Sequence, residues 1–148
     1  MYKHILVSTD GSRLSAKAIK TAVRLARLAG AKLTGAYIMA PYTPPSYGEG
    51  VVYMAELSPK RYKEAAERAA KKALAAIEVE AETAGIRPLG AMLTADQPWE
   101  GILRIARAKK CDLIVMASHG RRGLAGLLLG SETTKVLTHS KIPVLVCR

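Results

Sequence analysis

Short apolar runs alternate along the chain with longer segments in which apolar residues recur at helical spacing. Each apolar run is bounded by turn signals and predicts a buried strand; the runs are 3–9, 32–39, 88–94, 112–117 and 142–147. The segments between them predict helices: from Ser12 to Gly30, from Ser58 to about Ala84, from Asp96 and Pro98 onward, and from Ser131 to about His139. Ser12 and Asp96 are the expected N-caps of their helices.

Strands that alternate with helices predict an α/β fold, in which a parallel sheet carries helices on both faces. With 148 residues, the chain has the usual length of one domain, and we expect a single domain over residues 1–148. Prolines and glycines interrupt residues 40–57, so regular structure cannot continue through them. A connection of this length is usually functional or mobile, and we expect a mobile loop over about 40–57.

The chain carries 23 Lys and Arg against 12 Asp and Glu, a formal net charge of +11. This excess raises nucleic acid as a partner. Many of the cations form helical stripes, and one stripe consists of Arg13, Lys17, Lys20, Arg24 and Arg27. Such stripes are usually solvated helix faces, and no aromatic residues stand among these cations to stack on bases. We therefore do not expect nucleic acid as a partner, whereas anionic ligands such as nucleotides suit the charge.

Cysteine usage and the length of the apolar runs limit the class of protein further. Cys111 and Cys147 are the two cysteines and neither lies in a C-x-x-C pair, so we expect no disulfide framework. Hydrophobic residues make up 49% of the chain, which excludes a disordered protein. No apolar run reaches the roughly 18 residues of a membrane span, and Met1 leads directly into a core-like segment. We expect a cytoplasmic protein that does not enter the membrane.

In open parallel sheets, ligands bind at the carboxyl ends of the strands, so the residues that follow each strand are the candidates. The segment 117–133 follows the fourth predicted strand, is rich in glycine and ends where a helix begins. Free N–H groups and the helix dipole at such a point bind phosphate, with the hydroxyls of Ser131 and Thr133 as further donors. Arg121 or Arg122 would add a counter-charge. The alternative is a glycine-rich turn with a capping serine.

Asp10 follows the first predicted strand. Its carboxylate either accepts hydrogen bonds from a ribose, holds a metal ion, or is simply the Asp of an Asp-Gly turn. The chain has no P-loop and no G-x-G-x-x-G after a strand. Its three histidines have no metal-ligand spacing with one another or with the cysteines, so we predict no protein metal site.

A serine hydrolase is a further alternative, because Ser118 lies on a predicted strand-to-helix turn. That motif needs a small residue where Met116 stands, and we do not expect the adjacent His119 to reach the hydroxyl. No general base is positioned for water, since Asp10 and the distant histidines are the only candidates. We assign no catalytic residue and expect at most slow ATP hydrolysis or autophosphorylation.

The chain resembles the universal stress protein family in its opening ILVSTDGS, its block ILRIARAKKCDLIVMASHG and its closing GSETTKVLTHSKIPVLV. The resemblance covers essentially the whole chain. The nucleotide-binding branch of that family carries the pattern G-x2-G-x9-G-[ST] after its fourth strand. Gly120, Gly130 and Ser131 match this pattern, whereas Ala117 replaces its first glycine. The resemblance implies a three-layer sandwich with a five-stranded parallel sheet in the order 3-2-1-4-5.

The resemblance also implies a nucleotide site for ATP with Mg²⁺. The implied contacts are Ser8, Asp10, Ile38, Met116, Ala117, Gly120, Gly130, Ser131, Glu132 and Thr133. Asp10 would meet ribose or phosphate, and Ile38 would present its backbone to adenine. The implied function is an ATP-binding, nucleotide-responsive stress or regulatory module that forms a homodimer through the strand Ile142–Cys147. Because of Ala117, a dimeric interaction module without nucleotide stays the alternative.

Overall fold

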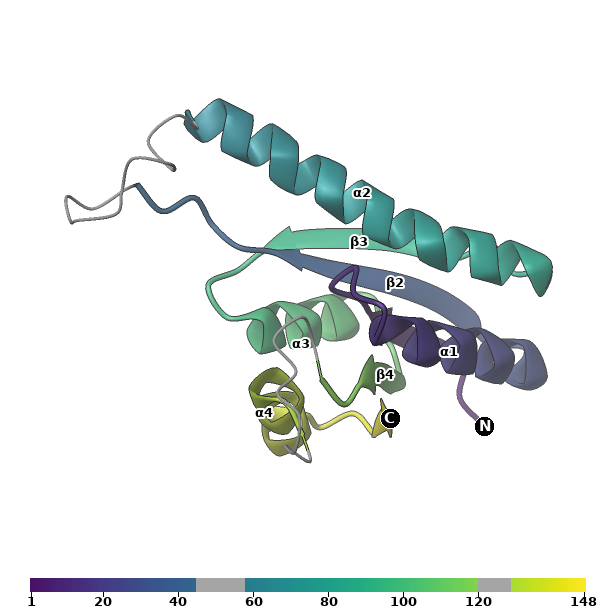
Figure 1. Ribbon diagram of the computed structural model, residues 1–148. Helices are drawn as coiled ribbons and strands as arrows, with labels where there is room; N and C mark the ends of the chain where they lie inside the picture. The colour runs from purple at the N-terminus through teal and green to yellow at the C-terminus, as the bar shows by residue number, and fades with distance from the viewer. Residues whose placement is uncertain (45–57, 120–128) are drawn as a thin grey trace.

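The computed structural model describes residues 1–44, 58–119 and 129–148 (Figure 1). Its elements are β1 (His4–Ser8), α1 (Ser15–Ala29), β2 (Lys32–Met39), α2 (Pro59–Thr83), β3 (Leu89–Thr94), α3 (Pro98–Ala108), β4 (Leu113–Ala117), α4 (Ser131–His139) and β5 (Val144–Cys147). The strands form one sheet in the order β3-β2-β1-β4-β5, and every neighbouring pair is parallel. The α/β fold and this strand order are confirmed.

Helices cover both faces of the sheet, α1 and α2 on one side and α3 and α4 on the other (Figure 1). Successive residues of β1 alternate between the two resulting cores. Ile5 and Val7 pack under α1 and α2, whereas Leu6 packs under α3 and α4, and all three are fully buried. A central parallel strand buried on both faces must be apolar at every position, which explains why it reads as an unbroken apolar run.

The end of α1 and the start of α2 lie where the sequence predicts. Gly30 ends α1 with a φ of 61°, a left-handed conformation that glycine adopts without strain. The hydroxyl of Ser58 accepts a hydrogen bond from the backbone N–H of Arg61 at 3.3 Å, and Pro59 occupies the first position of α2.

The expected caps of α1 and α3 are wrong. Helix α1 begins after Leu14 without a side-chain cap, and Ser12 contributes only its carbonyl, which accepts from the backbone and hydroxyl of Ser15. Gln97 rather than Asp96 stands at the N-cap of α3. The N–H group of Trp99, near the start of α3, is instead satisfied by a carboxylate from α4, which a local cap rule cannot foresee.

Strand β5 is an edge strand, as the arrangement requires, but it is shorter than predicted. It begins at Val144 because Pro143 has no N–H group and the Ser140 side chain bonds to both backbone groups of Ile142. At the start of the predicted loop 40–57, the carbonyl of Ala40 accepts a hydrogen bond from the hydroxyl of Tyr62 in α2 at 3.0 Å. Residues 45–57 lie outside the described part of the chain.

Candidate functional site

The carboxyl ends of β2, β1 and β4 lie side by side and bring the predicted site residues to one edge of the sheet. After β1 the chain turns sharply at Thr9 and Asp10. One carboxylate oxygen of Asp10 accepts from the backbone N–H of Ser12 at 2.9 Å, and the Thr9 hydroxyl accepts from the N–H of Gly11 at 3.1 Å. These bonds hold the half-buried carboxylate of Asp10 at the mouth of the strand, as an Asp-Gly turn requires and as a ribose contact would need.

The end of β4 is bound directly to the start of α4. The backbone N–H of Gly130 donates to the carbonyl of Ser118 at 2.7 Å, and the hydroxyl of Thr133 donates to the carbonyl of Ala117 at 3.0 Å. A Cβ atom added to Gly130 would lie 3.2 Å from the Ser118 oxygen and 3.4 Å from the Cα atom of His119. The φ of Gly130 is −70°, so this glycine is needed for close backbone approach and not for its conformational freedom.

The N-terminus of α4 presents backbone donors at this edge. The first hydrogen bond of the helix runs from the N–H of Thr134 to the carbonyl of Gly130 at 3.0 Å. The N–H groups of residues 131–133 precede it and have no acceptor within the helix, and the N-cap residue Gly130 supplies no side-chain cap. Ser131, the first residue of the helix, is exposed. This set of donors, with the helix dipole, is suited to an anion such as a phosphate.

Glu132 points away from this set of donors. Its carboxylate accepts from the backbone N–H of Trp99 in α3 at 2.9 Å and pairs with the ammonium group of Lys135 at 3.4 Å. Lys135 in turn donates to the side chain of Gln97 at 3.2 Å. The carboxylate of Glu132 therefore ties α4 to α3, and only its backbone N–H remains available to the predicted site.

The remaining predicted residues that the structure describes lie at or next to the same edge, and Met116 differs from the others in its burial. Ser8 and Ile38 are half-buried at the ends of β1 and β2, whereas Met116 is 5% exposed and belongs to the core under α3 and α4. Ala117 is half-buried at the end of β4. Gly120, which the motif match requires, lies outside the described residues.

The expectation that His119 cannot reach its serine neighbour is wrong. The hydroxyl oxygen of Ser118 lies 3.1 Å from Nδ1 of His119. However, Ser118 is only 8% exposed, and Nε2 of His119 is buried without a hydrogen-bond partner in the part of the chain that the structure describes. The carboxylate of Glu132 is engaged with α3, so it does not supply the third member of a triad.

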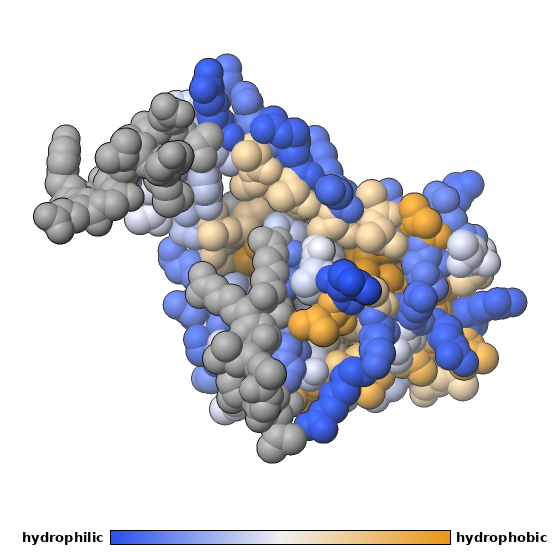
Figure 2. All heavy atoms as spheres, viewed as in Figure 1, coloured by the Kyte–Doolittle hydropathy of each residue, from blue (hydrophilic) through white to orange (hydrophobic). Residues whose placement is uncertain are grey.

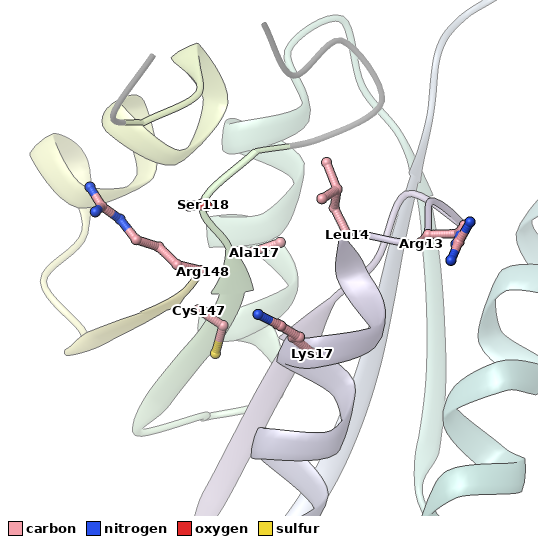
Figure 3. Close-up of a pocket in the computed structure, with 7 residues that line it drawn as sticks. All are labelled: Arg13, Leu14, Lys17, Ala117, Ser118, Cys147 and Arg148. Atoms are coloured by element: carbon pink, nitrogen blue, oxygen red, sulfur yellow. The ribbon is translucent and has the colours of Figure 1, made fainter. Parts of the chain in front are cut away.

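A pocket of about 130 Å³ opens beside this edge, between the start of α1 and the ends of β4 and β5 (Figure 3). Its lining consists of Arg13, Leu14, Lys17, Ala117, Ser118, Cys147 and Arg148. Lys17 and Cys147 point toward the space between α1 and β5 (Figure 3). Sequence reasoning missed this pocket, because it considered the ends of the first, second and fourth strands but not that of the last.

Within residues 1–44, 58–119 and 129–148, no three His, Cys, Asp or Glu side chains gather as metal ligands would. No helix in this part of the chain combines the length and apolar character that a membrane span needs.

Comparison with known proteins shows which family this chain resembles. The model of the universal stress protein family matches residues 1–148. Universal stress protein MJ0531 of Methanocaldococcus jannaschii is 34% identical over 148 residues, covering 100% of this chain and 83% of that protein. A universal stress protein of Thermus aquaticus is 34% identical over 148 residues, covering 100% of both chains.

Solved structures also resemble the chain over nearly its whole length, among them the following two. The structure of hypothetical protein MJ0577 of Methanocaldococcus jannaschii matches with a TM-score of 0.79 and 29% identity, covering 99% of this chain and 95% of that one. The crystal structure of a universal stress protein in complex with cAMP matches with a TM-score of 0.71 and 28% identity, covering 99% and 97%.

Proposed function

This chain belongs to the universal stress protein family, and from that membership and the site geometry we propose that it binds ATP with Mg²⁺ at the carboxyl edge of its sheet. The similar protein whose structure contains cAMP supports an adenine nucleotide as the ligand class. On this proposal, the protein is a nucleotide-responsive regulatory module. Hydrolysis is slow at most, because no described side chain is placed as a general base beside the phosphate donors.

The observation that carries the proposal is the join between β4 and α4. The 2.7 Å bond from Gly130 to Ser118 holds the N-terminus of α4 against the sheet edge. The N–H groups of residues 131–133, which have no acceptor within the helix, would hold phosphates there, and Asp10 would meet the ribose from the next strand. Mg²⁺ is a hard cation that binds through phosphates and one or two carboxylates, so it would arrive with ATP, with Asp10 as the nearby carboxylate.

Titration calorimetry with Mg²⁺ and ATP tests the proposal, and we expect a dissociation constant in the micromolar range. At a ligand concentration a hundred times that constant, unfolding should become about 2.7 kcal/mol less favourable. Ser131→Ala removes an exposed hydroxyl beside the phosphate donors and should weaken binding several-fold. Thr138→Ala, at the opposite end of the same helix, is the matched control and should bind as the unmodified protein does.

Ala117 favours the second candidate, a dimeric interaction module without nucleotide. Its methyl group stands where the family motif has a glycine, at the half-buried end of β4. If this methyl hinders ATP, Ala117→Gly should tighten binding. Absence of both heat and thermal stabilisation at millimolar ATP would reject ATP binding and favour the interaction module.

We also propose a homodimer that pairs β5 with its copy across a two-fold axis. β5 is at the edge of the sheet, and its Leu145 is 36% exposed. An apolar edge strand invites pairing, and proteins normally cover it or pair it. Sedimentation equilibrium should give about twice the chain mass of 15.9 kDa, and a mass near 15.9 kDa at tens of micromolar would contradict the dimer.

A further inference from the structure

The outer face of α1 is strongly cationic. Lys17, Lys20, Arg24 and Arg27 follow one another along this face, Arg13 precedes them, and all five side chains are exposed. The opposite face of the helix is buried against the sheet through residues such as Ala18, Ala22 and Ala26. In Figure 2, hydrophilic side chains extend over the region that α1 occupies in Figure 1. Within α1 the stripe is about 15 Å long, at 1.5 Å per residue.

No acidic residue neutralises this stripe from within the helix. Ser15–Ala29 contains no Asp or Glu, and none of the five cations forms a salt bridge with another described residue. Helix α2 differs, because Glu64 and Glu67 stand four residues from cations along the same helix. The α1 stripe is therefore a concentrated positive charge on a rigid element, whereas the α2 charges are mixed.

The linear shape of the stripe favours a linear polyanion over an anionic membrane surface. Exposed leucines lie only near its two ends, Leu14 at 52% and Leu28 at 80% exposed, so the face has no continuous apolar band to enter a membrane. Single-stranded nucleic acid is usually held by aromatic side chains that stack on bases, and α1 has none. A duplex requires no such platform, because its phosphates carry one negative charge per roughly 1.7 Å of helix axis.

We propose that the outer face of α1 binds duplex DNA through its phosphate backbone, without reading its sequence. Arg13 and Lys17, at the N-terminal end of the stripe, also line the pocket, and Arg148 borders the same pocket from the end of β5 (Figure 3). The cations of α1 have no aromatic residues among them, which argued against nucleic acid in the sequence analysis. This lack argues against stacking on bases, but contacts to phosphates do not require aromatic residues. Arg13 and Lys17 share the pocket lining with Ala117 of the proposed nucleotide site, whereas Lys20, Arg24 and Arg27 are not part of that lining.

The test is fluorescence anisotropy of the full-length protein with a labelled 20-base-pair duplex of mixed sequence, titrated at several salt concentrations. We expect a dissociation constant of roughly 10⁻⁴–10⁻⁶ M that weakens steeply with salt, as non-specific binding does. Lys20→Gln with Arg24→Gln removes two cations from the stripe. The variant should bind about tenfold more weakly or worse at low salt, and the slope of log K against log salt should fall by about 2.

The control is Lys71→Gln with Lys72→Gln, which removes the same charge from exposed positions on α2. It should leave the slope unchanged, and circular dichroism should show that both variants keep the fold. The proposal is overturned if duplex does not bind at 50 mM salt, if the two variants lose affinity equally, or if the single strand binds more tightly than the duplex. Binding confined to anionic phospholipid vesicles would identify a membrane surface instead and would also overturn it.

Discussion

A single methyl group added at Gly101 of α3 would press against Ile38, a residue of the candidate site. A Cβ atom at this position would lie 2.7 Å from Cδ1, 2.9 Å from Cγ2 and 3.0 Å from Cγ1 of Ile38. Cδ1 is the flexible end of that side chain, but the two Cγ atoms are attached directly to its Cβ. They cannot move away unless the χ1 angle of Ile38 rotates or the backbone shifts.

Two opposing terms set the expected effect of Gly101→Ala. Replacing glycine by alanine inside a helix stabilises it by about 1 kcal/mol. Overpacking a filled core costs typically 1–3 kcal/mol. We therefore expect a net loss of about 1 kcal/mol in the free energy of unfolding, and a weakened ATP affinity because Ile38 lies at the predicted adenine contact.

Urea unfolding of four proteins separates these terms: the unmodified protein, Gly101→Ala, Ile38→Ala and the double variant. Ile38→Ala removes all three contacting carbons, so in that background Gly101→Ala should stabilise by up to about 1 kcal/mol. The two changes should then couple by about 1–3 kcal/mol. Equal stabilisation by Gly101→Ala in both backgrounds would refute the steric argument.

Three further predictions concern polar groups outside the phosphate donors. Burial alone would raise the pKa of Asp112, but the backbone N–H groups of His4 and Lys3 donate to its carboxylate at 2.9 and 2.7 Å and leave the pKa lowered. Because the pKa is lower in the folded protein, the ionised carboxylate stabilises the fold above the unfolded pKa of about 3.9, and this stability is lost as the pH falls. Asp112→Asn should therefore lower the free energy of unfolding by about 1 kcal/mol at pH 7. In this variant the urea midpoint should also fall less steeply below about pH 5 than in the unmodified protein. Glu132→Gln should cost about 1 kcal/mol by weakening the bond to Trp99 and the Lys135 pair, whereas Glu132→Ala should cost more; equal urea midpoints for all three proteins would contradict this role. Burial, with the neighbouring Asp112 charge, raises the pKa of Cys111 to about 11, so a thiol reagent at pH 8 should label only the half-buried Cys147 in the folded protein, and two rapidly reacting thiols per chain would show the reasoning to be wrong.

Much of the site was predictable because it follows from position in the fold. The apolar run through Ile5–Val7 and the turn at Asp10 place the end of β1 correctly from the sequence alone. The glycine-rich segment before Ser131 likewise predicts a helix start at the sheet edge, and α4 begins there. What each of these residues contacts was open. Whether they bind ATP remains a prediction that rests on the family resemblance and on this geometry.

The sequence by itself determined which segments are strands and helices, where glycine and proline end them, and that the sheet is parallel. These properties depend on backbone preferences and on the period of apolar residues, which are local. Strand order did not follow from spacing and came from the family resemblance. Only the tertiary structure decided that the carboxylate of Glu132 accepts a hydrogen bond from Trp99, 33 residues away, and that a pocket lies between the start of α1 and the ends of β4 and β5. The partner of a polar side chain depends on which distant segments the sheet places next to it, and local spacing does not contain that information.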